Sequence, residues 1–387
     1  MGSCAVLGAA AVLLLAGCRR TLPAGWVYVT GVTPTAATVV WTGRGTERVE
    51  CRSGGALAPA PATLARPHGL ASARFEGLRP GAAYACRLLD ATIRSPRVRF
   101  RTAPSGSERF TFIAVGDTGD GSAEAAALAR RIARARPAFL IHLGDTAYRY
   151  ASGAALDSRF FRPYRRALAR MPFFPTPGNH DLQSGSRYSE VFAPARIHED
   201  GEHEDGEMEQ YAFDWGAAHL VSVSAAEIAR GEEASARWLA DDLARVAARP
   251  WRIVFLHEPP FSAGAKKVVR GLRKRLEPIV EAGHVDLMLA GHQHSYQRAE
   301  PLCEHVADAR VLQVISGGGG KALDPSAAHP KFPRTASATH YLRVTVSPER
   351  LDIRAIDLDG HVLDRFRRLR ASPPPCRPGG WPAPIEK

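Results

Sequence analysis

The N-terminal part of the chain alternates short apolar runs with turn residues. Between residues 24 and 104, runs rich in β-branched and aromatic residues are separated by Gly and Pro. These runs are 26–32 (WVYVTGV), 37–43 (ATVVWTG), 73–90 and 97–104 (RVRFRTAP). Short runs bounded by turn residues are typical of strands in an antiparallel sandwich. The pattern predicts a small all-β sandwich domain over residues 24–104.

From residue 108 the pattern changes to apolar strands that end in polar loops and alternate with amphipathic helices. The predicted strands are 110–117, 138–145, 218–224, 251–257, 285–290 and 311–316. A hairpin of 341–346 with 351–356 is expected to close the domain. This alternation predicts an α/β domain over residues 108–370, followed by a Pro-rich tail over 371–387.

The helices of this α/β domain are predicted from the spacing of apolar residues. Ser122 is a suitable N-cap for a helix whose apolar face carries Ala125, Leu128 and Ile132. Two more helices are predicted over 233–247 and 268–282. The acidic segment 199–209 precedes these two helices. It is predicted to form an exposed loop, because contiguous like charges repel one another and stay solvated.

The extreme N-terminus has the features of an export signal. Residues 5–16 (AVLGAAAVLLLA) form an apolar run that is too short to span a bilayer but long enough for a signal-peptide core. The run leads into Leu15-Ala16-Gly17-Cys18, which resembles the bacterial lipobox. This predicts a lipoprotein signal peptide over 1–18, with a lipid on Cys18 as the membrane partner. Plain secretion is the alternative, because no Lys or Arg precedes the run.

Cysteine content fits an exported protein. Cys51, Cys86, Cys303 and Cys376 remain after the signal peptide and Cys18 are set aside, and an oxidising compartment favours disulfides among them. Four thiols allow three pairings. Because Cys51 and Cys86 share the sandwich region and the other two lie in the later region, we expect bridges within each region. Unpaired buried thiols are the alternative.

Composition excludes several classes of protein. The chain is 45% apolar and 23% charged, which is ordinary for a globular protein, and no stretch after the signal is long enough to cross a membrane. The net charge of +12 raises nucleic acid as a partner. However, only six of the 51 basic residues are lysines, and the arginines are spread along an alanine-rich chain. Compositional bias explains this spread, and no specific nucleic-acid binding is expected.

Five short motifs stand where predicted strands end. They are GDTG at 116–119, GDTAY at 144–148, GNHD at 178–181, VFLH at 254–257 and GHQH at 291–294. Loops at the carboxyl ends of parallel strands converge on one crevice. The Asp, Tyr, Asn and His side chains of the five motifs are therefore expected to meet, although they are far apart in the sequence.

This order of motifs resembles the calcineurin-like metallophosphoesterases, and Tyr148 narrows the resemblance to the purple acid phosphatases. The likeness covers residues 110–300, and the Gly77–Gly81 turn followed by Tyr84 adds a resemblance to a fibronectin type III module. The resemblance implies a four-layer αββα sandwich of two mixed sheets behind the β-sandwich domain.

The resemblance also implies two metal ions, Fe(III) and a divalent Zn, Fe or Mn. One ion would be held by Asp117, Asp145, Tyr148 and His294. The other would be held by Asp145, Asn179, His257 and His292, so that Asp145 bridges the pair. Phenolate and carboxylates favour a trivalent ion, whereas imidazoles and an amide oxygen suit a divalent one. An uncoordinated Tyr148 beside two divalent ions is the alternative.

The implied activity is an exported phosphatase that hydrolyses phosphate monoesters by attack of a metal-bound hydroxide. His180 would lie beside the substrate and protonate the leaving oxygen or bind the phosphoryl group, the alternative being an orienting role. Further His residues that plant-like members carry after His257 are absent, which leaves Lys266 and Lys267 as candidate phosphate contacts. A phosphodiesterase or nucleotidase with the same metals, and a non-catalytic surface binding protein, are the alternative functions.

Three other features are expected to be structural. His142 lies within an apolar strand and is predicted to be a core residue. Asp120 and Asp181 are predicted to form turns or to orient the candidate ligands. The glycines Gly317–Gly320 are compatible either with a close backbone turn near the metals or with a plain loop.

Overall fold

The computed structural model describes residues 22–379, apart from 44–46, 66–68, 90–96, 193–209, 265, 267, 326–327 and 373–374. Four predictions lie outside the described residues: the signal peptide with Cys18, the acidic segment, Lys267, and the last part of the Pro-rich tail. The described parts of the tail, 371–372 and 375–379, contain no helix or strand.

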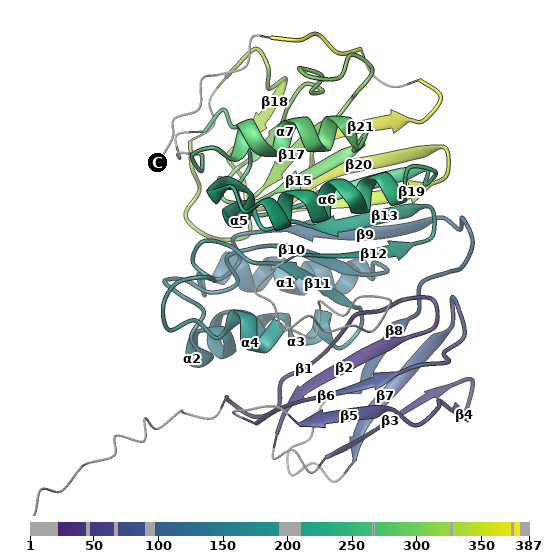
Figure 1. Cartoon of the computed structure of the whole chain (residues 1–387). Coiled ribbons are helices and arrows are strands. Elements are labelled where there is room, and N and C mark those ends of the chain that lie inside the picture. Colours follow the sequence, from purple (N-terminus) through teal and green to yellow (C-terminus); the bar gives the residue numbers. More distant parts are fainter. Residues whose placement is uncertain are drawn as a thin grey trace, which may run out of the picture.

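The N-terminal region is an antiparallel β-sandwich, as the alternating pattern predicts (Figure 1). One sheet has the order β1 (Val27–Thr30), β2 (Ala37–Thr42), β6 (Leu70–Phe75), β5 (Ala62–Ala65). The other has the order β4 (Ala56–Leu57), β3 (Arg48–Ser53), β7 (Ala83–Leu89), β8 (Val98–Arg101). The Tyr84 hydroxyl accepts a hydrogen bond of 2.9 Å from the backbone N–H of Arg79, which fastens the turn before β7 to that strand.

The α/β region contains a six-stranded mixed sheet. Its order is β11 (Phe173–Thr176), β10 (Leu140–Leu143), β9 (Phe110–Val115), β19 (His340–Ser347), β20 (Arg350–Asp357), β21 (Val362–Leu369). The strands β9, β10 and β11 are parallel, whereas β19 pairs antiparallel with both β9 and β20. The predicted hairpin therefore does not close the domain: β19 is a central strand, and the unpredicted β21 forms the edge.

A seven-stranded mixed sheet lies against the first sheet. Its order is β12 (Tyr211–Trp215), β13 (Ala218–Ser222), β14 (Trp251–Phe255), β15 (Leu287–Ala290), β17 (Leu312–Ser316), β16 (Tyr296–Arg298), β18 (Arg334–Ala336). Its four middle strands, β13, β14, β15 and β17, run parallel. The six predicted strands from 110–117 to 311–316 all occur, shortened by one to four residues, whereas each of the two hairpin strands is two residues longer than predicted.

Helices cover the outer faces of the two sheets and complete the four predicted layers (Figure 1). On the six-stranded side they are α1 (Ala123–Ala135), α2 (Gly153–Ala155), a π-helix (Leu156–Phe161), α3 (Arg162–Leu168) and α4 (Tyr188–Phe192). On the seven-stranded side they are α5 (Ala225–Arg230), α6 (Glu233–Arg245) and α7 (Leu272–Ala282).

Two predicted helix starts can be compared with the structure. Helix α1 begins as predicted, because the Ser122 side chain accepts from the backbone N–H of Ala125 at 3.1 Å. Helix α7 begins at Leu272 rather than at 268, because Gly271 before it has a left-handed conformation with φ 78°. A residue in that conformation interrupts a right-handed helix.

Aromatic rings fill the space between the two sheets. Phe139 stacks on Phe112 with 5.1 Å between ring centroids and lies 4.7 Å from Trp215 of the facing sheet. Phe174 and Phe213, again from opposite sheets, stack at 3.9 Å. All five rings are buried. Because interiors are close-packed, these rings fix the separation of the sheets and therefore the relative positions of the loops at their ends.

The β-sandwich is attached to the helices below the six-stranded sheet (Figure 1). Trp26 stacks on Phe161 at 4.0 Å and donates from its indole N–H to Asp157 at 2.9 Å. Tyr28 on β1 donates from its hydroxyl to the Val191 carbonyl. Two buried aromatic residues with satisfied polar ends make this a packed interface rather than a loose linker.

Both disulfides form as predicted. Cys51 on β3 is bonded to Cys86 on the neighbouring β7, and Cys303 is bonded to Cys376. The second bridge ties the described part of the C-terminal tail to the loop after β16. Among the described residues, no helix is long and apolar enough to cross a membrane.

Candidate metal centre

All seven candidate metal ligands lie at the carboxyl ends of parallel strands. Asp117 follows β9, Asp145 and Tyr148 follow β10, and Asn179 follows β11 in the six-stranded sheet. His257 follows β14, and His292 and His294 follow β15 in the facing sheet. The two sheets therefore bring together side chains that are up to 177 residues apart in the sequence. This convergence confirms the expectation from the motif positions.

One group of donor atoms forms around Asp117. The Tyr148 hydroxyl donates to Asp117 Oδ1 at 2.9 Å, and His294 Nε2 lies 3.3 Å from the same oxygen and 3.2 Å from the tyrosine oxygen. The other imidazole nitrogen of His294, Nδ1, donates to the Ala322 carbonyl. This bond turns Nε2 toward the aspartate and the tyrosine.

A second group forms around Asn179. Its Oδ1 lies 3.2 Å from His257 Nε2 and 3.1 Å from His292 Nδ1. His257 Nδ1 donates to the Leu143 carbonyl at 2.7 Å, which directs Nε2 into the site. Fixing the outer imidazole nitrogen in this way is the usual means of orienting a metal-ligating His.

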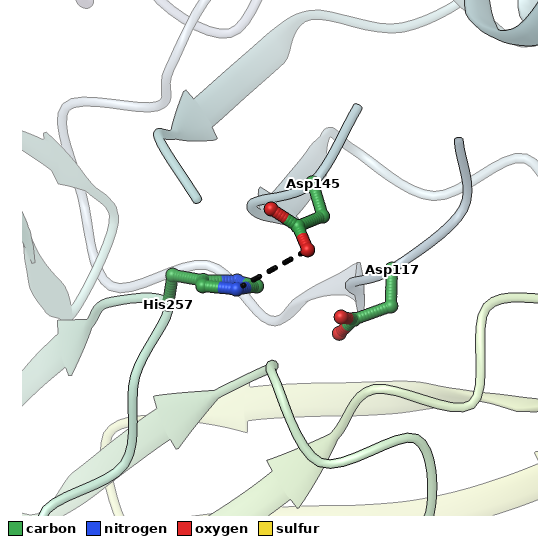
Figure 2. Close-up of side chains that lie close together, drawn as sticks. All are labelled: Asp117, Asp145 and His257. Carbon is green, nitrogen blue, oxygen red and sulfur yellow. Dashed lines mark ion pairs between the residues drawn. The ribbon is translucent and has the colours of Figure 1, made fainter. Parts of the chain in front are cut away.

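Asp145 links the two groups. Its Oδ2 lies 3.6 Å from His257 Nε2, and its Oδ1 accepts from the backbone N–H of His180 at 3.0 Å. Figure 2 shows Asp145, Asp117 and His257 pointing toward a common centre. One ligand atom from each lies within 4.8 Å of the others, and all three side chains are buried. Two carboxylates and an imidazole at this spacing fit the donor set of a metal ion.

The backbone at the site is strained to aim these side chains. Asp117, Asp145 and His292 have φ values of 61°, 58° and 67°, in the left-handed region that costs a non-Gly residue about 1 kcal/mol or more. Glycines allow the tight packing around them. A Cβ on Gly178 would collide with the Asp145 carboxylate, and one on Gly317 would collide with Gln293 and Asp117. Of the two readings of Gly317–Gly320, the close turn at the site is therefore the correct one.

The charges at the site are strongly coupled. Burial alone would raise the pKa of Asp117, but the hydrogen bond from His294 and the charge of His257 hold that pKa well below its usual range. Burial alone would lower the pKa of His257, but Asp145 and Asp117 outweigh it and raise the pKa to about 9. Burial and the same two carboxylates raise the pKa of Tyr148 well above its usual value. The buried negative charge therefore requires positive charge in the centre.

His180 lies at the rim of the site. Its ring centroid is 4.7 Å from that of Tyr148, and the residue is half-buried. Its Nδ1 is hydrogen-bonded to the Arg149 carbonyl, so this nitrogen carries the proton. In the part of the chain that the structure describes, Nε2 has no hydrogen-bond partner, which leaves it available to a bound molecule.

Residues outside the motifs support the site. Lys321, from the loop after Gly317–Gly320, pairs with Asp120 at 2.9 Å and lies 4.8 Å from the Tyr148 ring centroid. Asp324 accepts from the His294 backbone N–H at 2.7 Å and pairs with Lys266 at 3.3 Å. Neither Lys321 nor Asp324 was identifiable from the sequence, because no strand-end motif precedes them. Lys266 also donates to the His292 carbonyl, so it braces the ligand loop.

Two residues have the structural roles expected of them. Asp181 accepts from the backbone N–H groups of Thr146 and Gly178 and so holds the two loops together. His142 is buried in β10, where its Nε2 lies 2.8 Å from Thr118 Oγ1. Burial lowers the pKa of His142 to about 3, which keeps it neutral as a core residue.

The arrangement can be compared with known proteins. The family model of the calcineurin-like phosphoesterases matches residues 110–296, which contain all seven candidate ligands. Mouse (Mus musculus) acid phosphatase type 7 is 30% identical over 343 residues, which are 78% of this chain and 73% of that protein. The chain belongs to the calcineurin-like phosphoesterases and is purple acid phosphatase-like.

Other relatives of this phosphoesterase agree with that placement. Human (Homo sapiens) acid phosphatase type 7 is 29% identical over 333 residues, which are 74% of each protein. The structure of a purple acid phosphatase from yellow lupin (Lupinus luteus) seeds has a TM-score of 0.75 at 19% identity, covering 88% of this chain and 73% of that one. This structural likeness shows that the β-sandwich and the two-sheet region share one architecture with the lupin protein.

The geometry predicts that Gly178→Ala weakens metal binding by this phosphoesterase. The added methyl group would collide with both the carboxylate and the backbone nitrogen of Asp145 and so displace this residue, which links the two donor groups. We expect bound metal, measured by elemental analysis of the purified protein, to fall by about tenfold or more, since one ligand is worth at least about 1.4 kcal/mol.

Gly106→Ala is the matched control, because a Cβ there meets nothing within 4 Å. It should keep the metal content of the unmodified protein. Full metal content in Gly178→Ala would show that the close approach to Asp145 is unimportant.

Proposed function

We propose that this protein is an exported phosphatase that hydrolyses phosphate monoesters at a dinuclear metal centre. The observation that carries the proposal is the pair of donor groups, Asp117 with Tyr148 and His294, and Asn179 with His257 and His292, on either side of Asp145. Membership of the phosphoesterase family and the similarity to acid phosphatase type 7 support the same activity.

The seven side chains would hold two cations, with the Asp145 carboxylate shared between them. Such a pair supplies Lewis acidity, which neutralises charge on the phosphoryl oxygens and lowers the pKa of a water molecule. The site fits this role because the acids Asp117 and Asp145 are buried at 0% and 2% exposure. Burying two carboxylates this closely without compensating positive charge is unfavourable.

His180 would serve the leaving group. Its Nδ1 donates to the Arg149 carbonyl, so Nε2 is the nitrogen that would protonate the leaving oxygen, and it could do so only from the charged ring. Lys321, placed over the face of Tyr148, adds positive charge at the same rim and can attract a dianionic ester. No other imidazole from the loop after His257 is needed for this arrangement.

The activity is tested with p-nitrophenyl phosphate and its bis ester. We expect hydrolysis of the monoester to exceed that of the diester, and Asp145→Asn to lower monoester turnover by about a thousandfold, because a neutral amide cannot bridge two cations. Initial rates of the purified, metal-loaded variants provide the measurement.

Asp308→Asn, which changes an exposed carboxylate outside the five motifs, is the control and should retain full activity. Faster hydrolysis of the bis ester would assign the protein to the phosphodiesterases. No hydrolysis of either ester by the metal-loaded protein would favour the non-catalytic binding protein.

The identity of the metals is proposed from the donors. Tyr148, Asp117 and Asp145 supply hard oxygen atoms, which favour Fe(III), whereas Asn179 with two imidazoles suits divalent Zn, Fe or Mn. We expect the purified protein to show a visible tyrosinate-to-iron absorption band that disappears in Tyr148→Phe. A colourless, fully active protein that contains only divalent ions would contradict this assignment and indicate an uncoordinated Tyr148.

Export is proposed from the signal sequence and the disulfides. Two disulfides are typical of oxidising compartments outside the cytoplasm. We propose that Cys18 carries a lipid that anchors the protein to a membrane. Radiolabelled lipid should be incorporated into the full chain and not into Cys18→Ser; equal labelling of both would contradict the anchor.

A further inference from the structure

A cleft of about 840 Å³ lies between the β-sandwich and the α/β region, away from the metal centre. The sandwich contributes residues of β3, β7 and β8 to its wall. The α/β region contributes the start of β9 and the loop between α1 and β10. Aromatic side chains of both regions line it, including Tyr84 and Trp215. The volume is that of a small-molecule site rather than of a packing defect.

Arginine dominates the lining of this cleft. Six of its 19 lining residues are arginine, against about one residue in nine over the whole chain. They are Arg52, Arg99, Arg101, Arg109, Arg136 and Arg170, and all six are exposed. Glu108 is the one acidic residue in the lining. The general richness of the chain in arginine therefore does not explain this concentration.

Most of these arginines make no side-chain hydrogen bond or ion pair among the described residues. Arg52 pairs with Glu50, and Arg101 donates to the Gly81 carbonyl. The side chains of Arg99, Arg109, Arg136 and Arg170 make neither a hydrogen bond nor an ion pair with any residue that the structure describes. Asp352 interacts electrostatically with Arg109, but its carboxylate forms ion pairs with Arg350 and Arg367 instead.

The backbone holds these arginines in place from both sides. The backbone N–H of Arg99 on β8 donates to the Ala169 carbonyl at 2.9 Å, which fixes Arg99 of the sandwich beside Arg170 of the α/β region. Arg136 ends α1 in a left-handed conformation with φ 48°, at a position where glycine is favoured. An arginine at such a position costs stability, and it places a positive charge in the lining of the cleft.

The cleft is a separate site from the metal centre. Glu108, Arg109 and Phe110 lie at the start of β9, whereas Asp117 follows its end. Seven residues of extended chain span about 20 Å. A molecule in the cleft therefore does not touch the metal ligands.

We propose that this cleft binds a small ligand that carries two or more phosphate groups. Four unpartnered guanidinium groups on facing walls can each bind phosphate oxygens through two parallel N–H donors. A ligand with several phosphates suits the cleft because one phosphate group could contact only some of these guanidinium groups at once. The concave, two-walled shape suits a compact anion better than a flat membrane surface.

Isothermal titration of the metal-loaded protein with inorganic tripolyphosphate tests the proposal. We expect two classes of site, the metal centre and the cleft. The double variant Arg99→Gln with Arg170→Gln should lose about 100-fold in affinity at the cleft, or about tenfold for each charged contact. Its hydrolysis of p-nitrophenyl phosphate should stay within about twofold of the unmodified rate. Binding at the cleft and hydrolysis at the metal centre are therefore tested independently of each other.

Arg136→Gly distinguishes binding from folding. It removes one charge and also relieves the left-handed strain, so affinity at the cleft should fall by about tenfold while the melting temperature does not fall. Arg134→Gln, on the same helix but outside the cleft, is the matched control and should bind as the unmodified protein does.

Three results would overturn the proposal. Unchanged affinity in both cleft variants would place the second class of site elsewhere. Citrate binding as tightly as tripolyphosphate would show that the cleft does not recognise phosphate. Binding to phosphatidylglycerol vesicles without any binding of tripolyphosphate would make the basic surface a membrane contact instead.

Discussion

The structure depends on the burial of two carboxylates, Asp117 and Asp145, at the ends of adjacent strands β9 and β10. Two negative charges this close repel each other and lose hydration when they are buried, so positive charge must lie between them. In the described structure, His294 and His257 lower the pKa of Asp117, and the two carboxylates raise the pKa of His257 to about 9, which is the direction that this requirement demands. The other features of the site follow from meeting the requirement with cations.

The two-sheet architecture is what makes such a site possible. Asp117, Asp145 and Asn179 come from one sheet, and the three histidines come from the other. Aromatic rings of β9, β11 and β12 hold the sheets at one separation, so the donor atoms meet without help from a flexible loop. The left-handed conformations of Asp117, Asp145 and His292 then turn the side chains inward at the strand ends. Rigid elements thus position the ligands, and short strained turns aim them.

Local features of the fold were predictable from the sequence, whereas the pairing of strands that are far apart in the sequence was not. The N-cap of α1 depends on residues within three positions of one another, and its prediction was correct. The place of β19 depends on its pairing with β9, more than 200 residues earlier, and no local pattern carries that information. The strand β11 was missed because it contains only four residues and Pro175, and β21 was missed because half of an edge strand is exposed.

The same distinction applies to the site. The seven candidate ligands were identifiable because each stands in a short motif at a strand end, and family resemblance gave their grouping. Lys321 and Asp324 could not be identified from the sequence. They reach the site from a loop whose course depends on the packing of Gly317–Gly320 around Asp117. The arginine cleft was hidden for a similar reason, since its six arginines come from five separate segments that only the docking of the two regions brings together.

The most direct test of the account is anomalous X-ray diffraction from crystals of the metal-loaded protein. We expect two anomalous peaks about 3.5 to 4 Å apart, one on each side of the Asp145 carboxylate. One peak should lie beside Asp117, Tyr148 and His294, and the other beside Asn179, His257 and His292. A single peak, or peaks away from these seven side chains, would contradict the claim that the buried carboxylates are held together by a pair of cations.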